Sequence, residues 1–207
     1  MQKIMEKLRS SFAPNEPIFT RDVLSLLNDT PRSTVYYQLE RAVSSGSLSK
    51  SGHGVYYIPT DTVVGPSIIS PLKPLARKYI TDNGNIFGYW GGLMLENQAG
   101  LTTQNPTVLE IATNKATKRL TRLGPMSGYR DVVLRPPRIE VSAENVDTLK
   151  FLDLVTDVSD LNSEEAANVL FEIAQSLDGE KVLDALKYYP SKTSKKLIGS
   201  GLLNVLA

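Results

Sequence analysis

The sequence predicts an α+β fold in two domains, and three patterns lead to this prediction. Apolar residues recur every three or four positions through the first 44 residues, which is the period of helices. Between residues 47 and 135, several short segments alternate apolar and polar residues, as strands do. From Ala143 onward the helical period returns. A chain of 207 residues is long enough for one large or two small domains, each with its own core.

The first helix is predicted over the segment QKIMEKLRSSF. Ile4, Leu8 and Phe12 are spaced four apart with Lys and Arg between them, which is the spacing of an amphipathic helix. Pro14 and Pro17 follow and are expected to end it, because proline cannot donate the backbone hydrogen bond that a helix interior needs.

Two more helices are expected in the next thirty or so residues. In FTRDVLSLL, Thr20 is the predicted N-cap, and Asp22 adds negative charge to the first turn, where the helix dipole favours it. The third helix is predicted to start at Thr30 and Pro31, because Thr caps helices and Pro suits the first helical position. It should stop at Gly46, which adopts the left-handed conformation easily. Its predicted buried stripe is Val35, Leu39 and Ala42 or Val43.

After the third helix the pattern changes to a period of two. The runs SLSK and VYYIP are joined by the tight segment SGHG, which predicts a β-hairpin. Helix, helix, turn, helix and hairpin is the order of elements in a winged helix-turn-helix domain. We therefore predict such a domain over residues 1–60.

The rest of the chain is predicted to form a linker and a second domain. TDTVVGPSIISPLKP is rich in Pro, Gly, Ser and Thr, so residues 61–74 are interpreted as the linker. Residues 75–207 are predicted to form a mixed α/β domain with a helical C-terminal bundle. Helices are expected in LARKYITDNG, as far as Gly84, and in YWGGLMLENQAG, whose glycine pair implies close packing. Strands are expected in PTVLEIATN, RLTRLG and RDVVLRPPR, and helices near 144–155, 163–177 (capped by Ser163), 179–188 and 191–205.

Charge is distributed unevenly along the chain, although the net charge is only +1. Residues 1–60 contain seven Lys/Arg and five Asp/Glu, and residues 61–140 contain ten and six. Residues 141–207 contain six and eleven. The first two thirds can therefore approach a polyanion, whereas the last third is acidic. The alternative is that these charges only solvate the surface.

The composition of the chain limits both the cellular compartment of the protein and the kinds of site that it can form. The chain has no cysteine, which excludes disulfides, cysteine nucleophiles and thiolate metal sites and fits a reducing compartment. The segment MQKIMEKLRSSF lacks the apolar core of a signal peptide, and no stretch approaches membrane-spanning length. We expect a cytoplasmic protein without a membrane partner.

Most enzyme classes are hard to build from these residues. The single histidine, His53, has no neighbouring Ser and Asp that would form a triad, and zinc-protease, P-loop and dinucleotide motifs are absent from the sequence. We therefore predict a non-enzymatic protein without metal or cofactor. The alternative is a metal-dependent enzyme or nuclease subunit that holds Mg²⁺ through carboxylates of the second domain. The acidic pairs Asp157/Asp160, Glu164/Glu165 and Asp178/Glu180 lie at predicted helix starts or turns, where capping is the simpler role.

The third predicted helix has a hydroxyl-rich aromatic face. In TPRSTVYYQL, residues Ser33, Thr34 and Tyr37 point away from Val35 and Leu39. In helix-turn-helix proteins this helix enters the major groove and its first residues meet base edges, while neighbouring groups hold phosphates. Arginines suit guanine edges and phosphates, and a polar or basic wing tip suits the backbone. The predicted DNA-binding residues are Arg32, Ser33, Thr34, Tyr37 and Arg41, with Lys50 and His53 on the wing.

Two further interpretations of these surfaces are open. The domain could serve protein contacts only, with Tyr36 and Tyr37 as a packing surface, in which case promoter DNA would not be bound. A second basic set in NKATKRLTRLG and beyond is a candidate additional DNA contact, or simply an exposed strand and turn. Its members are Lys115, Lys118, Arg119, Arg122 and Arg130.

The chain resembles the AbiEi family of antitoxins over about residues 19–140. The resemblance is carried by FTRDVLSLLNDTPRSTVYYQLERAVSSGSLSKSGHGVYYIP followed by NIFGYWGGLMLENQAGLTTQNPTVLEIATN. The wing strand GVYYIP and the turn GLTTQNP are the most telling segments, and they are specific only as a pair in this order. In GLTTQNP, Thr102, Thr103 and Gln104 are expected to satisfy backbone groups of a turn.

The resemblance implies an antitoxin of a bacterial type IV toxin–antitoxin system with a role in abortive defence against phage. The N-terminal domain would bind repeats in double-stranded promoter DNA and repress its own operon. The C-terminal domain would counter a nucleotidyltransferase-like toxin without forming a stable complex with it. Whether the protein self-associates on DNA is left open.

Overall fold

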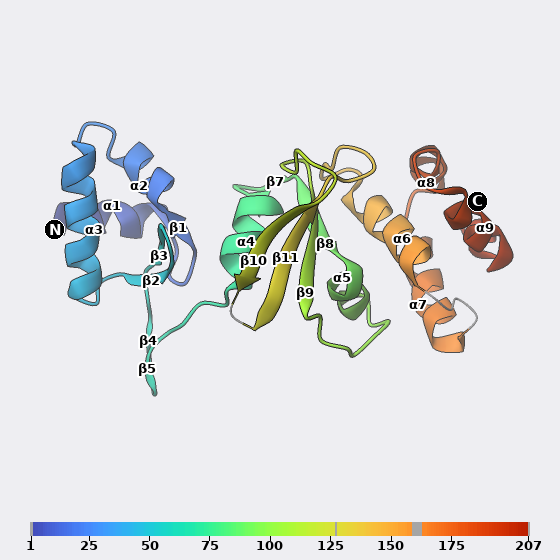
Figure 1. The fold of residues 1–207 in the computed structure, drawn as a ribbon, viewed down its shortest axis with the longest axis horizontal. Coiled ribbons are helices and arrows are strands. Elements are labelled where there is room, and N and C mark those ends of the chain that lie inside the picture. The colour runs from blue at the N-terminus through green and yellow to red at the C-terminus, as the bar shows by residue number, and fades with distance from the viewer. Residues whose placement is uncertain (1, 127, 159–162, 207) are drawn as a thin grey trace. The chain divides into compact units, whose positions relative to one another are not determined.

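The computed structural model of this protein describes residues 2–126, 128–158 and 163–206. Helices and β-sheets occur together, which confirms the α+β class (Figure 1). The chain divides into two compact units, Met1–Arg77 and Lys78–Ala207. The division falls inside helix α4 (Leu72–Tyr79), beyond the predicted linker at 61–74.

The first unit contains three helices and a small antiparallel sheet. The strand order in this sheet is β1-β3-β2, and its core is formed mainly by aliphatic side chains of the helices. Because Ile4 and Leu8 are fully buried, α1 is amphipathic as its four-residue spacing predicts. The elements are α1 (Gln2–Ser11), β1 (Ile18–Phe19), α2 (Thr20–Leu26), α3 (Arg32–Ser44), β2 (Ser49–Gly52) and β3 (Val55–Tyr57).

The starts of α2 and α3 differ from the prediction. The N-cap of α2 is Phe19, not Thr20, because Phe19 stays extended while it pairs with Val55 in the sheet. Asp22 supplies a hydrogen-bond acceptor at the N-terminal end of α2, since its carboxylate accepts the Phe19 N–H at 2.8 Å. The N-cap of α3 is Pro31, not Thr30, and its extended ψ of 136° keeps it outside the helix.

The segment between the β2–β3 hairpin and the second unit is structured. Strands β4 (Asp61–Thr62) and β5 (Gly65–Pro66) form a short antiparallel hairpin within the predicted linker. The hairpin base is held to the first unit, because the Ser67 hydroxyl donates to Asn15 Oδ1 at 2.5 Å and the Tyr57 hydroxyl donates to Ser67 O at 2.9 Å.

Two helix predictions after the linker were wrong in part. Helix α4 ends at Tyr79, not Gly84, because Asn83 and Gly84 adopt positive φ and turn the chain between β6 (Thr81–Asp82) and β7 (Asn85–Ile86). Within YWGGLMLENQAG the helix α5 (Gly92–Gln98) begins only at Gly92. The residues before it form strand β8 (Gly88–Gly91), which pairs with β9 (Val108–Thr113).

The second unit is built on a four-stranded mixed sheet of order β10-β11-β9-β8. Strand β9 pairs parallel with β11 (Tyr129–Arg135), and the outer pairs, including β10 (Thr121–Met126), are antiparallel. Strand β9 lies within its predicted segment, and β10 and β11 overlap theirs but extend to Met126 and begin at Tyr129. The alternation that predicted β9 is seen in its burial, because Leu109 and Ile111 are buried and Val108 and Glu110 are half-buried.

The C-terminal helices follow the sheet in the predicted order. Ser163 is the N-cap of α7 as predicted, since its hydroxyl accepts the Ala166 N–H at 3.3 Å. The last predicted helix, 191–205, ends at Gly199 because Gly201 takes a left-handed φ of 76°. The helices are α6 (Val146–Asp157), α7 (Glu164–Gln175), α8 (Gly179–Leu186) and α9 (Ser191–Gly199), followed by the 3₁₀ turn η1 (Leu202–Asn204).

Helix α6 is central to the second unit. Nine of its twelve residues are buried. It contacts strand β8 and helices α5, α7, α8 and α9 (Figure 1). In the described part of the chain, no helix is long and apolar enough to cross a membrane.

Candidate functional site

Helix α3 turns one face to the core of the first unit and the other to solvent. Val35, Leu39 and Ala42 are each 0% exposed, so the buried side is fixed. Tyr37 is 59% exposed, on the opposite side. The outward residues are Arg32, Ser33, Thr34, Tyr37 and Arg41, and all five are exposed.

Three of these outward residues share one row on the helix. Ser33, Tyr37 and Arg41 follow at intervals of four, so their side chains lie one above another. The Arg41 guanidinium lies 5.9 Å from the centre of the Tyr37 ring. In this part of the structure Arg32 and Arg41 have no carboxylate partner. The row therefore offers a hydroxyl, an aromatic ring and a cation that is not neutralised.

The β2–β3 hairpin is fixed against the start of α2. The Thr20 N–H donates to Gly54 O at 2.9 Å, and the Thr20 hydroxyl donates to the same oxygen at 3.2 Å. Gly54 needs to be glycine, because its φ is +68° and a Cβ would lie 3.1 Å from Thr20 Oγ1. Lys50 and His53 are exposed on this hairpin, in the same unit as α3. All the predicted DNA-binding residues are thus exposed on one compact unit.

The second basic set is not one patch. All its members are exposed, but Lys115 Nζ donates to Lys78 O at 2.7 Å and Arg122 pairs with Asp131 at 2.5 Å. Arg119 precedes β10 and Arg130 follows the turn at its other end. At ~3.3 Å per residue, strand β10 separates these two by roughly 20 Å. Lys118 and Arg119 remain together as an available basic pair.

A buried ionic cluster in the second unit was not predicted. Arg135 of β11 pairs with Glu110 of β9, Nε to Oε1 at 2.5 Å, and with Asp153 of α6. The Tyr89 hydroxyl of β8 donates to Asp153 Oδ2 at 2.7 Å. Asp153 is 5% exposed and Tyr89 is 1% exposed, so the cluster is closed to solvent at its centre. The one sequence signal was a carboxylate inside the apolar run FLDLV.

The glycine that ends β8 makes room for this cluster. A Cβ at Gly91 would lie 2.8 Å from Glu110 Oε1 and 3.4 Å from an Arg135 guanidinium nitrogen. Any larger residue would displace the Glu110 carboxylate from Arg135. The close packing predicted for the glycine pair therefore holds for Gly91, although it lies in a strand and packs against Glu110 rather than in a helix, while a Cβ at Gly92 would make only an ordinary contact at 3.7 Å.

The charge states of Tyr89 and Arg135 are fixed over the ordinary pH range. Burial, and then the charge of Asp153, raises the pKa of Tyr89, so the phenol stays neutral. Burial lowers the pKa of Arg135, but Asp153, Tyr89 and Glu110 together outweigh this and leave the pKa above its usual value. Burial, followed by Asp153, also raises the pKa of Tyr189, whose hydroxyl donates to Leu149 O at 3.1 Å. Because Tyr89 stays neutral and Arg135 stays charged, their contacts with Asp153 join the sheet to helix α6.

The carboxylate pairs considered for a magnesium site mostly lie at helix starts. Glu164 and Glu165 lie in the first turn of α7, and Asp178 is the N-cap of α8, accepting the Lys181 N–H at 3.3 Å. Asp160 lies outside the described residues. Across residues 2–126, 128–158 and 163–206, no group of three or more His, Cys, Asp or Glu is arranged to hold a metal ion.

The GLTTQNP segment is a turn stabilised by its own hydrogen bonds. The Thr102 hydroxyl accepts the Gln104 N–H at 3.1 Å, as predicted for a side chain that satisfies the backbone. The Asn97 amide donates to Gln104 O at 3.3 Å and ties the turn to α5.

Comparison of the chain with protein-family models, with curated proteins and with solved structures finds no match. These comparisons therefore assign the chain to no family.

Proposed function

We propose that this chain is a non-enzymatic, DNA-binding antitoxin of the AbiEi type that represses its own operon. The observation that carries the proposal is the outward face of α3, where Ser33, Tyr37 and Arg41 form one exposed row over a fully buried apolar stripe. A 59% exposed tyrosine beside an arginine without a carboxylate partner supports a surface that contacts another molecule.

In this proposal the first unit is a winged helix-turn-helix domain. Helix α3 is the recognition helix, α2 precedes it across a turn, and the β2–β3 hairpin is the wing. The outward row would meet base edges in the major groove, with Arg32 at the N-terminal end of the helix. Lys50 and His53 would contact the phosphate backbone from the wing. The Lys118/Arg119 pair is a candidate additional phosphate contact.

The second unit would counter a nucleotidyltransferase-like toxin. This follows from the sequence resemblance, which also implies action without a stable complex, within the cytoplasm and in phage defence. The acidic last third of the chain supports a division of labour, because six Lys/Arg against eleven Asp/Glu would repel DNA. DNA binding is therefore assigned to the first unit.

The test is binding of the purified protein to DNA from upstream of its own gene. Loss of a good base contact costs about 1–3 kcal/mol, so Tyr37→Ala and Arg41→Ala should each weaken binding roughly tenfold or more. The control is Arg9→Ala, which removes an exposed arginine from α1 in the same unit. Thermal unfolding of all three variants should match the parent protein.

Salt and a chelator separate the alternatives. Binding should fall steeply with ionic strength, because contacts to phosphates release counterions. DNA cleavage that needs Mg²⁺ and stops with chelator would favour a nuclease subunit. If the parent protein does not bind the DNA even at low salt, this proposal is wrong. The first unit would then serve protein contacts only, with Tyr36 and Tyr37 as a packing surface.

A further inference from the structure

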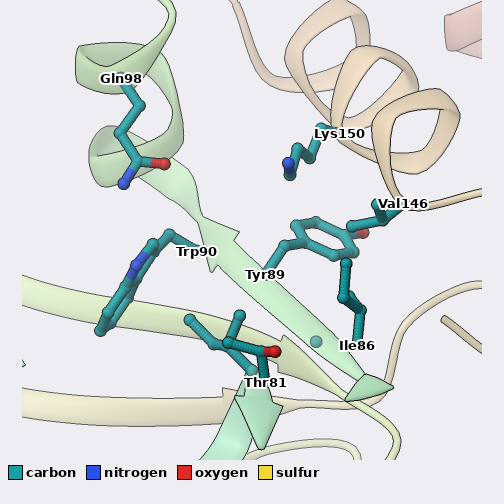
Figure 2. Close-up of a pocket in the computed structure, with 9 residues that line it drawn as sticks. Thr81, Ile86, Tyr89, Trp90, Gln98, Val146 and Lys150 are labelled. Atoms are coloured by element: carbon teal, nitrogen blue, oxygen red, sulfur yellow. The ribbon is translucent and has the colours of Figure 1, made fainter. Parts of the chain in front are cut away.

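A small pocket lies beside β8 in the second unit and is not used by the proposed function. Its volume is about 180 Å³, and we call it the Trp90 pocket (Figure 2). Tyr89, Trp90 and Ile86 form its walls, and Thr81, Gln98 and Lys150 bring polar ends to its rim. Strand β8, the β6–β7 hairpin, α5 and α6 each supply part of the lining, so it is built by the fold and not by one loop.

The walls of the Trp90 pocket are aromatic, aliphatic and fixed in position. Tyr89 is held by its hydrogen bond to Asp153 in the buried ionic cluster. Trp90 is half-buried and is the only tryptophan in the sequence. A cavity of ~150 Å³ accepts one aromatic ring. The Trp90 pocket is slightly larger, so it fits a flat ring system but not the whole of a larger molecule.

The polar groups at the rim are available to a ligand. In the described part of the chain, the side chains of Thr81 and Gln98 form no hydrogen bond. Lys150 Nζ is 2.9 Å from Asp147 Oδ1, in an exposed i,i+3 pair. Such pairs are weak because water screens them, so an incoming anion can compete for the ammonium group. Figure 2 shows Gln98 and Lys150 extending from two helices toward the space between Trp90 and Tyr89.

We propose that the Trp90 pocket binds a free nucleotide through its base. The base would lie against Trp90 and the aliphatic wall, since every base has a face that stacks on an aromatic ring. The Gln98 amide and the Thr81 hydroxyl would bond the edge of the base, which carries both donors and acceptors. The sugar would lie outside the pocket, and the phosphate would form an ion pair with Lys150. This proposal does not depend on DNA binding by the first unit.

The single tryptophan gives a direct readout in the full chain. Titration with AMP, GMP, CMP and UMP should change Trp90 fluorescence in a saturable way for at least one of them. Ribose 5-phosphate should give no change, because it lacks the base. Lys150→Gln should weaken binding about tenfold, as expected for a lost hydrogen bond to a charged group. Lys187→Gln is the matched control, because Lys187 forms the same kind of exposed i,i+3 pair with Asp184 at 2.6 Å.

Calorimetry repeats the titration without optical interference and includes Trp90→Ala, with circular dichroism to show that the variant is folded. The proposal fails if no nucleotide binds up to about 10 mM, which is well above a millimolar dissociation constant. It also fails if Lys150→Gln binds as well as Lys187→Gln. Equal binding of indole-3-acetate would contradict recognition of a base, and binding only of single-stranded oligonucleotides would replace the free nucleotide by a nucleic acid.

Discussion

At the scale of single residues, the second unit depends on charge placed where solvent is absent. Arg135 bridges Glu110 and Asp153, and Tyr89 completes the hydrogen bonding of Asp153. The Arg135 side chain is 18% exposed and that of Asp153 is 6% exposed. Removing Asp153 would leave Arg135 with Glu110 as its remaining carboxylate partner and would take away the acceptor of the buried Tyr89 hydroxyl. Breaking a buried pair in this way costs more than the intact pair contributes.

We therefore expect Asp153→Ala to lower the free energy of unfolding by about 3 kcal/mol, the lower end of the range for breaking a buried ion pair, because Arg135 keeps Glu110. The control is Asp147→Ala on the same helix, whose side chain is 72% exposed, so its loss should cost under about 0.5 kcal/mol. Denaturant unfolding measures both. Equal effects in the two variants would mean that the cluster adds nothing specific.

At the scale of elements, the β10–β11 pairing is irregular and is held by one carboxylate. Register shifts occur between Arg122 and Gly124 and between Gly124 and Met126. Asp131 bridges the irregularity, because its carboxylate accepts the Gly124 N–H at 3.0 Å and pairs with Arg122 at 2.5 Å. The hydrogen bond from Arg122 is the largest cause of the lowered pKa of Asp131.

The lowered pKa has a defined effect on stability against pH. Ionised Asp131 stabilises the folded state above its ordinary pKa of 3.8, and this stabilisation is lost as the pH falls through the lower folded-state value. Asp131→Asn should be less stable than the parent protein at neutral pH, and the difference should shrink below a pH of about 4. Thermal melts across this range measure it, and a constant difference at every pH would show that ionisation is not the cause.

Predictions from the sequence were correct where the apolar pattern within a single helix or strand is enough to predict its buried face. The outward face of α3 follows from the positions of Val35 and Leu39 alone. It failed where pairing across the chain overrides local preference. GYWG was interpreted as part of a helix, but partner strand β9 makes it a strand, and the pairing of Phe19 with Val55 moved the start of α2. The ionic cluster was missed because Arg135 and Glu110 are 25 residues apart and Tyr89 and Asp153 are 64 apart.

At the scale of the whole molecule, the two units are proposed to divide the work. We expect deletion of residues 1–70, which keeps α4 intact, to abolish repression of the operon and to leave protection against the toxin. The physical reason is that each unit has its own hydrophobic core, so the second does not need the first to bury its apolar residues.

A promoter reporter and a growth assay measure the two activities of this deletion separately. The control is the full chain with Tyr37→Ala and Arg41→Ala together, which should lose repression by a different route and keep protection. Loss of protection in step with loss of repression in both proteins would contradict the division between units.

The burial of α6 limits how the second unit can be dissected. Because nine of its twelve residues are covered, by the sheet and by the helices that follow, no cut on either side of it leaves a piece whose apolar surface is hidden from water. Deleting helices α7 to α9 would expose the apolar surface of α6 to water, and the truncated protein would be prone to precipitate. The same burial predicts that insertions are tolerated in loops at the edge of this unit and not between its sheet and helices α7 to α9.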